Sequence, residues 1–278
     1  DGLVRLVNAR TLYAQGIEVL GKATEPLARR GLNDLHGRVL LHQGLFHYYQ
    51  GNYDEARRLA DQELHLAQAR GDQWAIATGL CLLGSVFYDD NHYDEAEALW
   101  NRGLDLFARQ ADWEAVADCH ILLGNAAILR NFFSPTGKKP YRPPRAFFQE
   151  HYPPTAAVRT GAKAAIAHFN EALRLHTQSD NAAGIAYYWG VIGFPYYVLH
   201  DYDSAASAYR EAIAHFTKLD ARANLGQCHT WLAWVLMWQG KMNEARVHFH
   251  EALRLEMTGH AYKRMLDCLQ KYSLFLWV

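Results

Sequence analysis

Residues 52–56, N-Y-D-E-A, decide the fold of this chain, because close copies of the stretch return farther along it. H-Y-D-E-A ends at Ala96, D-Y-D-S-A ends at Ala205 and K-M-N-E-A ends at Ala245. The residue number rises by 40 from Ala56 to Ala96, and by 40 again from Ala205 to Ala245. A fixed period of this length is typical of stacked copies of one supersecondary unit. The sequence therefore predicts a repeat protein rather than a globule with a single closed core.

The period is interrupted once. Small residues recur in the same rhythm upstream of the alanines, at Gly44, Gly84, Gly124, Gly193 and Ala233. Their residue numbers rise in steps of 40, except that the step from Gly124 to Gly193 is 69. The step from Ala96 to Ala165 is also 69, and 69 exceeds 40 by 29, so a single insertion explains both offsets. We place the insertion within residues 131–161, where the 40-residue period is interrupted.

Composition limits the class of protein. The 278 residues are 50% hydrophobic and 21% charged, which is typical of an ordered chain. A formal net charge of -1 gives no global field for nucleic acid or an anionic membrane, so we expect neither as a partner. None of the four cysteines forms a C-x-x-C pair, which favours a reducing compartment and a cytoplasmic location. The sequence holds no run of roughly 18 apolar residues, so no membrane span is expected.

Each period reads as two helices. Residues 74–88 carry apolar side chains at steps of three and four, and residues 93–109 do the same, so both segments are expected to be amphipathic helices. Asp112 is expected to cap the next helix, with Asp72 and Asp180 in the matching positions. Glycine in mid-helix costs about 1 kcal/mol against alanine. The repeated mid-helix glycines therefore predict a closely approaching neighbouring helix.

This pattern resembles tetratricopeptide (TPR) repeats in a longer version, without the proline that usually closes each unit. The matching positions are Leu83-Gly84, Phe87, Ala96 and Trp100 in one unit, Ile192-Gly193, Tyr196, Ala205, Tyr209 and Ala212 in another, and Leu232-Ala233, Leu236, Ala245, Phe249 and Ala252 in a third. The resemblance implies an all-α, right-handed superhelix of five to six helix pairs forming a single solenoid over residues 1–278. We place the units at about 32–71, 72–111, 112–179 with the insertion 131–161, 180–219 and 220–258, with partial or capping helices at 1–31 and 259–278.

The stretch L-H-L-A-Q-A-R-G-D at residues 64–72 extends the resemblance to the C-terminal helical sensor arms of STAND-type signalling ATPases. Similar long repeats occur in peptide-sensing bacterial regulators and in kinesin light chains. The chain begins D-G-L-V-R and ends with an apolar segment, so it is expected to be a fragment of a longer protein. The resemblance implies the sensor or scaffold arm of a bacterial signalling protein, with other domains of the parent chain among its partners.

In such repeats the first helix of each unit lines a concave groove. The side chains expected to contact a protein or peptide segment there are Tyr88, Asn125, Tyr187, Phe194, Tyr197, Trp234 and Trp238. Aromatic side chains at helical spacing also pack between units, and that alternative stays open for each of them. Pro195 is expected to kink or split its helix, which produces either local curvature or a wider pocket.

The insertion is rich in proline, aromatic and basic residues. Its expected contact residues are Lys138, Lys139, Tyr141, Arg142 and Arg145. Two interpretations remain open. The segment is either a surface loop without a role, or a contact element for an acidic partner, another domain or, less favoured, nucleic acid.

No catalytic motif is present. The sequence holds neither a G-x-x-x-x-G-K-[ST] phosphate loop nor an H-E-x-x-H metal motif. His248 and His250 point in different directions on a helix and cannot share a metal. We therefore expect a non-enzymatic, protein- or peptide-binding scaffold or sensor with no cofactor and no metal. The alternative is a receptor for a small molecule or short peptide.

Overall fold

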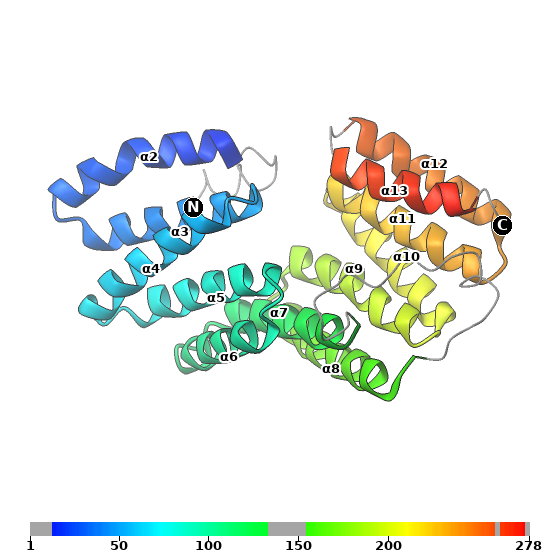
Figure 1. Cartoon of the computed structure of the whole chain (residues 1–278), viewed down its shortest axis with the longest axis horizontal. Helices are drawn as coiled ribbons and strands as arrows, with labels where there is room; N and C mark the ends of the chain where they lie inside the picture. The colour runs from blue at the N-terminus through cyan, green and yellow to red at the C-terminus, as the bar shows by residue number, and fades with distance from the viewer. Residues whose placement is uncertain (1–12, 133–153, 259–261, 276–278) are drawn as a thin grey trace. The chain divides into compact units, whose positions relative to one another are not determined.

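The computed structural model describes residues 13–132, 154–258 and 262–275. The chain divides into two compact units, Asp1–Ala126 and Ala127–Val278, and each is described by itself. Both units are built from α-helices, and the described residues contain no strand. Figure 1 shows the helices of each unit lying side by side in the order of the sequence.

The helices have nearly uniform length. In chain order they are α2 (Tyr13–Arg29), α3 (Asn33–Tyr49), α4 (Tyr53–Arg70), α5 (Gln73–Asp89), α6 (Tyr93–Arg109), α7 (Trp113–Phe132), α8 (Ala156–Gln178), α9 (Ala182–Val198), α10 (Tyr202–Lys218), α11 (Arg222–Trp238), α12 (Met242–Thr258) and α13 (Tyr262–Phe275). The two helices expected over residues 74–88 and 93–109 are α5 and α6, within one residue at each end. The all-α prediction is confirmed.

The connections explain the period. A residue with positive φ follows most helices, at Gly31, Gly51, Gly71, Asn91, Ala111, Asp180, His200, Asp220 and Gly240. On either side of the insertion, the residue numbers of these positions rise in steps of 20, which is half of the period. A left-handed residue just past a helix end stops the helix and turns the chain back. Each period therefore contains two helices joined by short turns.

Polar side chains begin several of the helices. Asp72 Oδ1 accepts a hydrogen bond from the Ala75 amide at 3.0 Å, and Asp112 Oδ1 accepts one from the Ala115 amide at 3.2 Å. Both caps were expected. The expectation for Asp180 is wrong, because Asp180 is the left-handed turn residue with φ 52°. Asn181 is the cap instead, since its Oδ1 accepts from the Gly184 amide at 2.9 Å.

The mid-helix glycines make room for rings. A Cβ on Gly84 would lie 2.6 Å from Nε1 of Trp100, and one on Gly193 would lie 2.5 Å from Cζ of Tyr209. The close approach is confirmed, and at both positions the glycine faces a large aromatic residue of the second helix. Trp100 also donates a hydrogen bond from Nε1 to the Cys81 carbonyl oxygen at 3.1 Å, which ties the second helix to the first.

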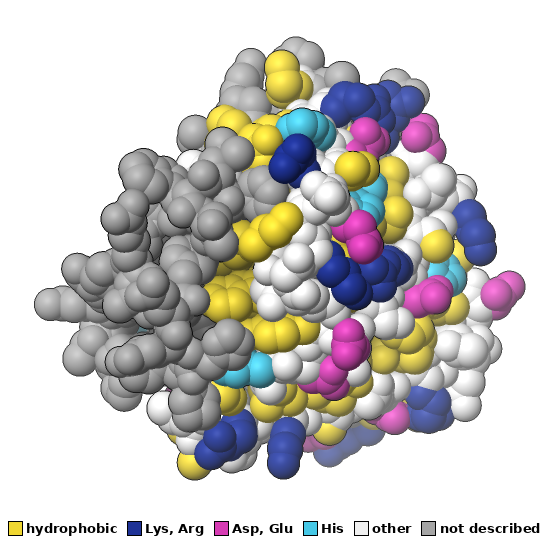
Figure 2. All heavy atoms as spheres, turned by 90° about the vertical axis from the view of Figure 1, so that its right-hand side faces the viewer, with side chains coloured by type: hydrophobic (Ala, Val, Ile, Leu, Met, Phe, Trp, Pro, Cys, Tyr) yellow, Lys and Arg dark blue, Asp and Glu magenta, His cyan; other side chains and the backbone are white. Residues whose placement is uncertain are grey.

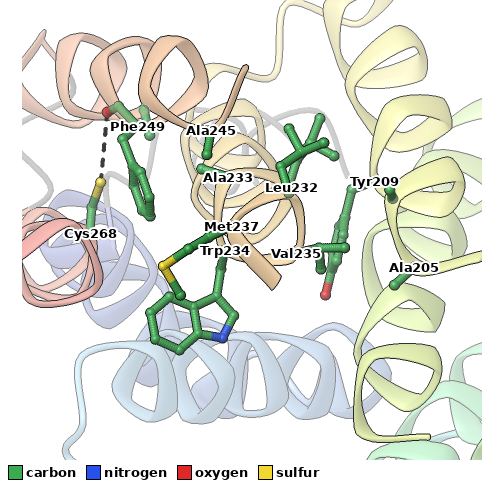
Figure 3. Close-up of a cluster of buried hydrophobic side chains, with 13 residues drawn as sticks. Ala205, Tyr209, Leu232, Ala233, Trp234, Val235, Met237, Ala245, Phe249 and Cys268 are labelled. Carbon is green, nitrogen blue, oxygen red and sulfur yellow. Dashed lines mark hydrogen bonds between the residues drawn. The ribbon is translucent and has the colours of Figure 1, made fainter. Parts of the chain in front are cut away.

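First helices of successive repeats also touch one another. In the first unit α3 contacts α5, and in the second unit α11 contacts both α9 and α13. The core of the second unit is centred on α11, where Leu232, Ala233 and Val235 are fully buried. Figure 3 shows Tyr209 on one side of α11 and Phe249 on the other, so α11 joins two successive helix pairs.

Two further expectations concern interruptions of the repeat. Pro195 does not split its helix, because α9 continues through it from Ala182 to Val198. A proline removes one backbone donor, and because residue 195 lies in the last turn of α9, only three helical residues follow it and little of the helix could be displaced. The interval expected to hold the insertion, 131–161, takes in the last residues of α7, which ends at Phe132, and the first turns of α8, which begins at Ala156. Residues 133–153 lie outside the described part of the chain.

Candidate functional site

The candidate binding surface is a set of rings on α9 and α11, the first helices of two successive repeats in the second unit. We call Phe194, Tyr197, Trp231 and Trp238 the aromatic row. Phe194 lies 5.4 Å from Trp231 between ring centroids, and Tyr197 lies 6.3 Å from Trp231. All four side chains are half-buried. The two helices therefore bring together aromatic residues from separate copies of the repeat, and each of these residues keeps part of its surface accessible.

Neighbouring side chains hold the row in place. Trp238 stacks on Tyr202 with 12° between the ring planes and 6.1 Å between centroids. Trp231 stacks on the buried Tyr209 at 6.4 Å. Because both contacts involve second-helix residues, the rings of the row are fixed by packing and lose little freedom when a partner binds.

Trp234 differs from the row. Only 8% of it is exposed, and it belongs to the core around α11. Its Nε1 donates a hydrogen bond to Tyr197 Oη at 2.9 Å. Burial raises the pKa of Tyr197 to about 12, so the hydroxyl is neutral at pH 7. Trp234, one of the expected contact residues, is therefore a buried residue that holds Tyr197 of the row in position, and it exposes little surface to a partner.

The other expected contact residues do not belong to the row. Tyr187 is 43% exposed on α9, two helical turns before Phe194. Tyr88 on α5 and Asn125 on α7 belong to the first unit, where Tyr88 lies 5.5 Å from both Tyr93 and Trp100 between ring centroids. The insertion residues Lys138, Lys139, Tyr141, Arg142 and Arg145 lie outside the described residues.

One contact of the row was not foreseen. Lys271 on α13 places Nζ 4.6 Å from the centroid of Trp231, within the range of a cation–π interaction, and also pairs with Asp267. Nothing in the sequence pointed to it, because α13 follows the last clear copy of the repeat. The row therefore has a basic group beside one of its four rings.

A polar hollow of about 370 Å³ lies elsewhere in the second unit, among residues of α10, α11, α12 and the turn before α11. Its lining includes the ion pairs Arg222–Asp220 and Arg254–Glu251, and His229. His229 Nδ1 lies 2.8 Å from His248 Nδ1, so one ring donates to the other. Burial, and then His248, lowers the pKa of His229 to about 4, and burial also lowers the pKa of His248. Both rings are neutral at pH 7.

Charge is dispersed over the surface. Figure 2 shows basic and acidic side chains interspersed on the face turned to the viewer. Among the described residues, no three His, Cys, Asp or Glu side chains are placed to hold a metal ion. No helix in the same part of the chain is long and apolar enough to cross a bilayer. The described surface offers accessible aromatic area together with ion pairs, and one of the basic side chains, Arg70, is shared by Asp34, Glu63 and Asp72.

Comparison with known proteins identifies the repeat. Residues 36–109 match the family model for the tetratricopeptide repeat. No curated protein sequence matches the chain significantly. Among solved structures, BtubC from P. vanneervenii is 19% identical with a TM-score of 0.64, and the match covers 88% of this chain and 91% of BtubC.

Two other similar structures are longer than this chain. A Rap protein complexed with Competence and Sporulation Factor is 15% identical with a TM-score of 0.69, over 87% of this chain and 59% of the Rap chain. A Signal Transduction ATPase with Numerous Domains with a tetratricopeptide repeat sensor, from Pyrococcus horikoshii, is 11% identical with a TM-score of 0.61, over 99% of this chain and 41% of that protein. At these identities the likeness shows the fold. This chain is a tetratricopeptide-like helical-repeat protein.

Proposed function

We propose that this protein is a non-catalytic scaffold or sensor module that binds a protein or peptide segment through the aromatic row on α9 and α11. The observation that carries the proposal is a set of four half-buried aromatic residues on the first helices of successive repeats. Three of their rings pack on one another, and the fourth, Trp238, packs on Tyr202. First helices are the ones that line the binding face in repeats of this kind.

The physical reason lies in what aromatic rings contribute to an interface. Tyr and Trp are enriched among the residues that dominate binding energy, because they bury much area and lose few rotatable bonds. A row fixed by Tyr202 and Tyr209 is already ordered before binding, which lowers the entropic cost of association. We expect a segment that inserts apolar or aromatic side chains between Phe194 and Trp238.

The wider setting is also part of the proposal. The structural likeness to a tetratricopeptide repeat sensor of a STAND protein supports a role as the sensor or scaffold arm of a larger bacterial signal-transduction protein in the cytoplasm. In that setting the bound segment belongs either to another protein or to another domain of the parent chain. Nucleic acid and membrane are not expected as partners, because basic and acidic residues are balanced at 28 and 29.

A peptide-display selection against the full chain tests the proposal. Selected peptides are titrated against wild type and the double variant Phe194→Ala/Trp238→Ala, with intrinsic tryptophan fluorescence as the readout. We expect the double variant to weaken binding by about 10- to 100-fold, since truncation of aromatic anchors costs about 1 kcal/mol or more each. Trp234→Ala is avoided because it would open a cavity in the core.

Trp113→Ala is the matched control. Trp113 is 51% exposed on α7 in the first unit, so the variant removes an exposed indole that is not part of the row. It should bind like wild type. Equal affinity of the wild type and the double variant, with both folded by circular dichroism, would exclude the aromatic row as the binding surface.

A receptor for a small molecule or short peptide is the second candidate. The hollow of about 370 Å³ beside His229 is within the size range of ligand sites, and a similar structure is of a Rap protein complexed with Competence and Sporulation Factor. A ligand of this class would raise the melting temperature of the wild type. Arg254→Gln would remove the shift if the hollow is the site, whereas Phe194→Ala/Trp238→Ala would remove it if the row is the site.

A further inference from the structure

Two cysteines of the first unit meet between consecutive first helices. Cys81 on α5 and Cys119 on α7 place their Sγ atoms 3.5 Å apart. Both thiols are free, Cys81 is half-buried, and Cys119 is 1% exposed. Their residue numbers differ by 38, so the repeat and not the local chain brings them together.

The same register recurs elsewhere, but only here does it join two thiols. An offset of 38 in residue number also pairs Leu41 with Gly79, where a Cβ on the glycine would lie 3.9 Å from Leu41 Cδ2. It pairs Gly190 with Cys228, where a Cβ on the glycine would lie 3.8 Å from the Cys228 Sγ. These contacts show that positions in this register face each other across successive first helices.

A glycine makes space for the pair. Seven residues after the alanine of each repeat, the chain has Glu63, Gly103, Ala172, Ala212 and Ala252. A Cβ on Gly103 would lie 2.7 Å from the Cys81 Sγ and 3.3 Å from the Ala77 carbonyl oxygen. The single glycine at this position therefore stands where the Cys81 sulfur needs room, on the helix between α5 and α7.

We propose that Cys81 and Cys119 form a reversible disulfide that ties α5 to α7. The sulfur atoms have to approach by about 1.5 Å to reach the bond length of a disulfide, a movement within reach of side-chain rotation. The linkage would join the first helices of two successive repeats across the intervening α6. It would therefore fix the spacing of these repeats when the surroundings become oxidising.

The co-reactant is a low-molecular-weight disulfide such as oxidised glutathione. The more accessible Cys81 attacks it as a thiolate, forms a mixed disulfide and releases one small thiol. Cys119 then attacks the Cys81 Sγ, gives up its proton to the second departing small thiolate and completes the internal bond. Two protein thiols are oxidised and one small disulfide is reduced to two thiols. The hydrogen bond with Cys81, together with burial, raises the pKa of Cys119, which agrees with its acting second.

The test uses the full chain, folded, in glutathione buffers of increasing oxidised fraction. After alkylation, trypsin places each cysteine on a different peptide, because Lys and Arg residues separate all four. We expect a linked pair of peptides 71–102 and 110–130 that reductant separates again. We also expect the melting temperature to rise by about 5–10 °C on oxidation, since the bond closes a long loop in the unfolded chain.

Controls separate this pair from the other thiols. Cys228→Ser should keep both the linked peptides and the shift in melting temperature, whereas Cys119→Ser should lose both. If Cys119→Ser fails to fold, the peptide map of the wild type still shows whether peptides 71–102 and 110–130 are linked. A glutathione adduct on Cys81 without the internal bond, or a linkage that forms only in urea, would overturn the proposal.

Discussion

At the scale of single residues, two glycines of α5 predict opposite effects of the same substitution. Gly84→Ala would bring a Cβ within 2.6 Å of Trp100 Nε1, and Trp100 is fully buried and cannot move aside. Gly79→Ala would meet its nearest neighbours only at 3.8 Å or more, which is ordinary contact. We expect Gly84→Ala to lower the free energy of unfolding by about 1–3 kcal/mol. Gly79→Ala should raise it by about 0.5–1 kcal/mol, because alanine is the better helix former.

Urea unfolding of the two variants beside wild type measures both effects. The two positions share a helix, so a general sensitivity of α5 to substitution would shift them in the same direction. Destabilisation of similar size at both positions would contradict the close packing of the Trp100 ring against Gly84.

The same scale shows how far the sequence can identify a binding residue. Trp231, Trp234 and Trp238 are spaced by three and four residues, which places them on one side of a helix. Trp234 is nevertheless in the core, whereas Trp231 and Trp238 are half-buried. One face of this helix contacts both the next repeat and solvent. A spacing of three and four residues therefore does not tell which side chains on that face are buried and which are accessible. Only the hydrogen bond from Trp234 to Tyr197 and the packing around it show which ring is enclosed.

At the scale of elements, the left-handed turns predict how the connections can be improved. Ala111 has φ 56°, in a region that costs a residue with a Cβ about 1–2 kcal/mol. Ala111→Gly relieves this cost and loses part of the gain through a more flexible unfolded chain. We expect the free energy of unfolding to rise by about 0.5–1 kcal/mol, measured by thermal or urea unfolding.

Gly71→Ala is the reverse experiment. Gly71 stands one period before Ala111 with φ 70°, and an added Cβ there would meet no atom within 4 Å. Any loss of stability therefore reports the backbone conformation alone. A gain on Gly71→Ala, or a loss on Ala111→Gly, would show that the turns are not held in the left-handed conformation in solution.

Helix positions were predictable at this scale because several independent signals marked each one. The repeated Y-D-E-A stretch, the small residues and the polar breaks all indicate the same boundaries, and α5 and α6 agree with them closely. Single signals were weaker guides. Pro195 leaves α9 continuous because it lies in the last turn of the helix. Asp180 is one residue away from the capping position that the offset of 69 assigns to Asn181.

At the scale of the whole molecule, histidine content makes stability depend on pH. The chain has 15 histidines and a net charge of -1 when they are neutral, so acidification turns it strongly positive. Self-repulsion of a cationic chain lowers the stability of the folded state in a general way. The pair His229 and His248 adds a specific contribution, because its pKa values in the folded protein are lowered by burial and by neighbouring charged groups.

Because the pKa values of both histidines are lowered on folding, the folded state loses stability when the pH falls. A histidine whose pKa falls from 6.5 to about 4 on folding binds protons more readily when unfolded, so stability is full above pH 6.5 and is lost as the pH falls toward 4. Between pH 7.5 and 5 we expect His229, whose ring is partly screened by solvent, to contribute a loss of about 1–2 kcal/mol in the free energy of unfolding. Arg210, Arg254, Glu244 and Glu251 also act on the pair, and their opposed charges partly offset each other.

Urea unfolding of the full chain at pH 7.5 and pH 5 isolates this contribution from the general one. The double variant His229→Gln/His248→Gln should lose about 1–2 kcal/mol less than wild type over this range, because it keeps every other titrating group. His65→Gln, which removes an exposed histidine of α4, should lose as much as wild type. If the double variant and wild type lose the same amount, the acid sensitivity belongs to the net charge of the molecule, and the buried pair has no special part in it.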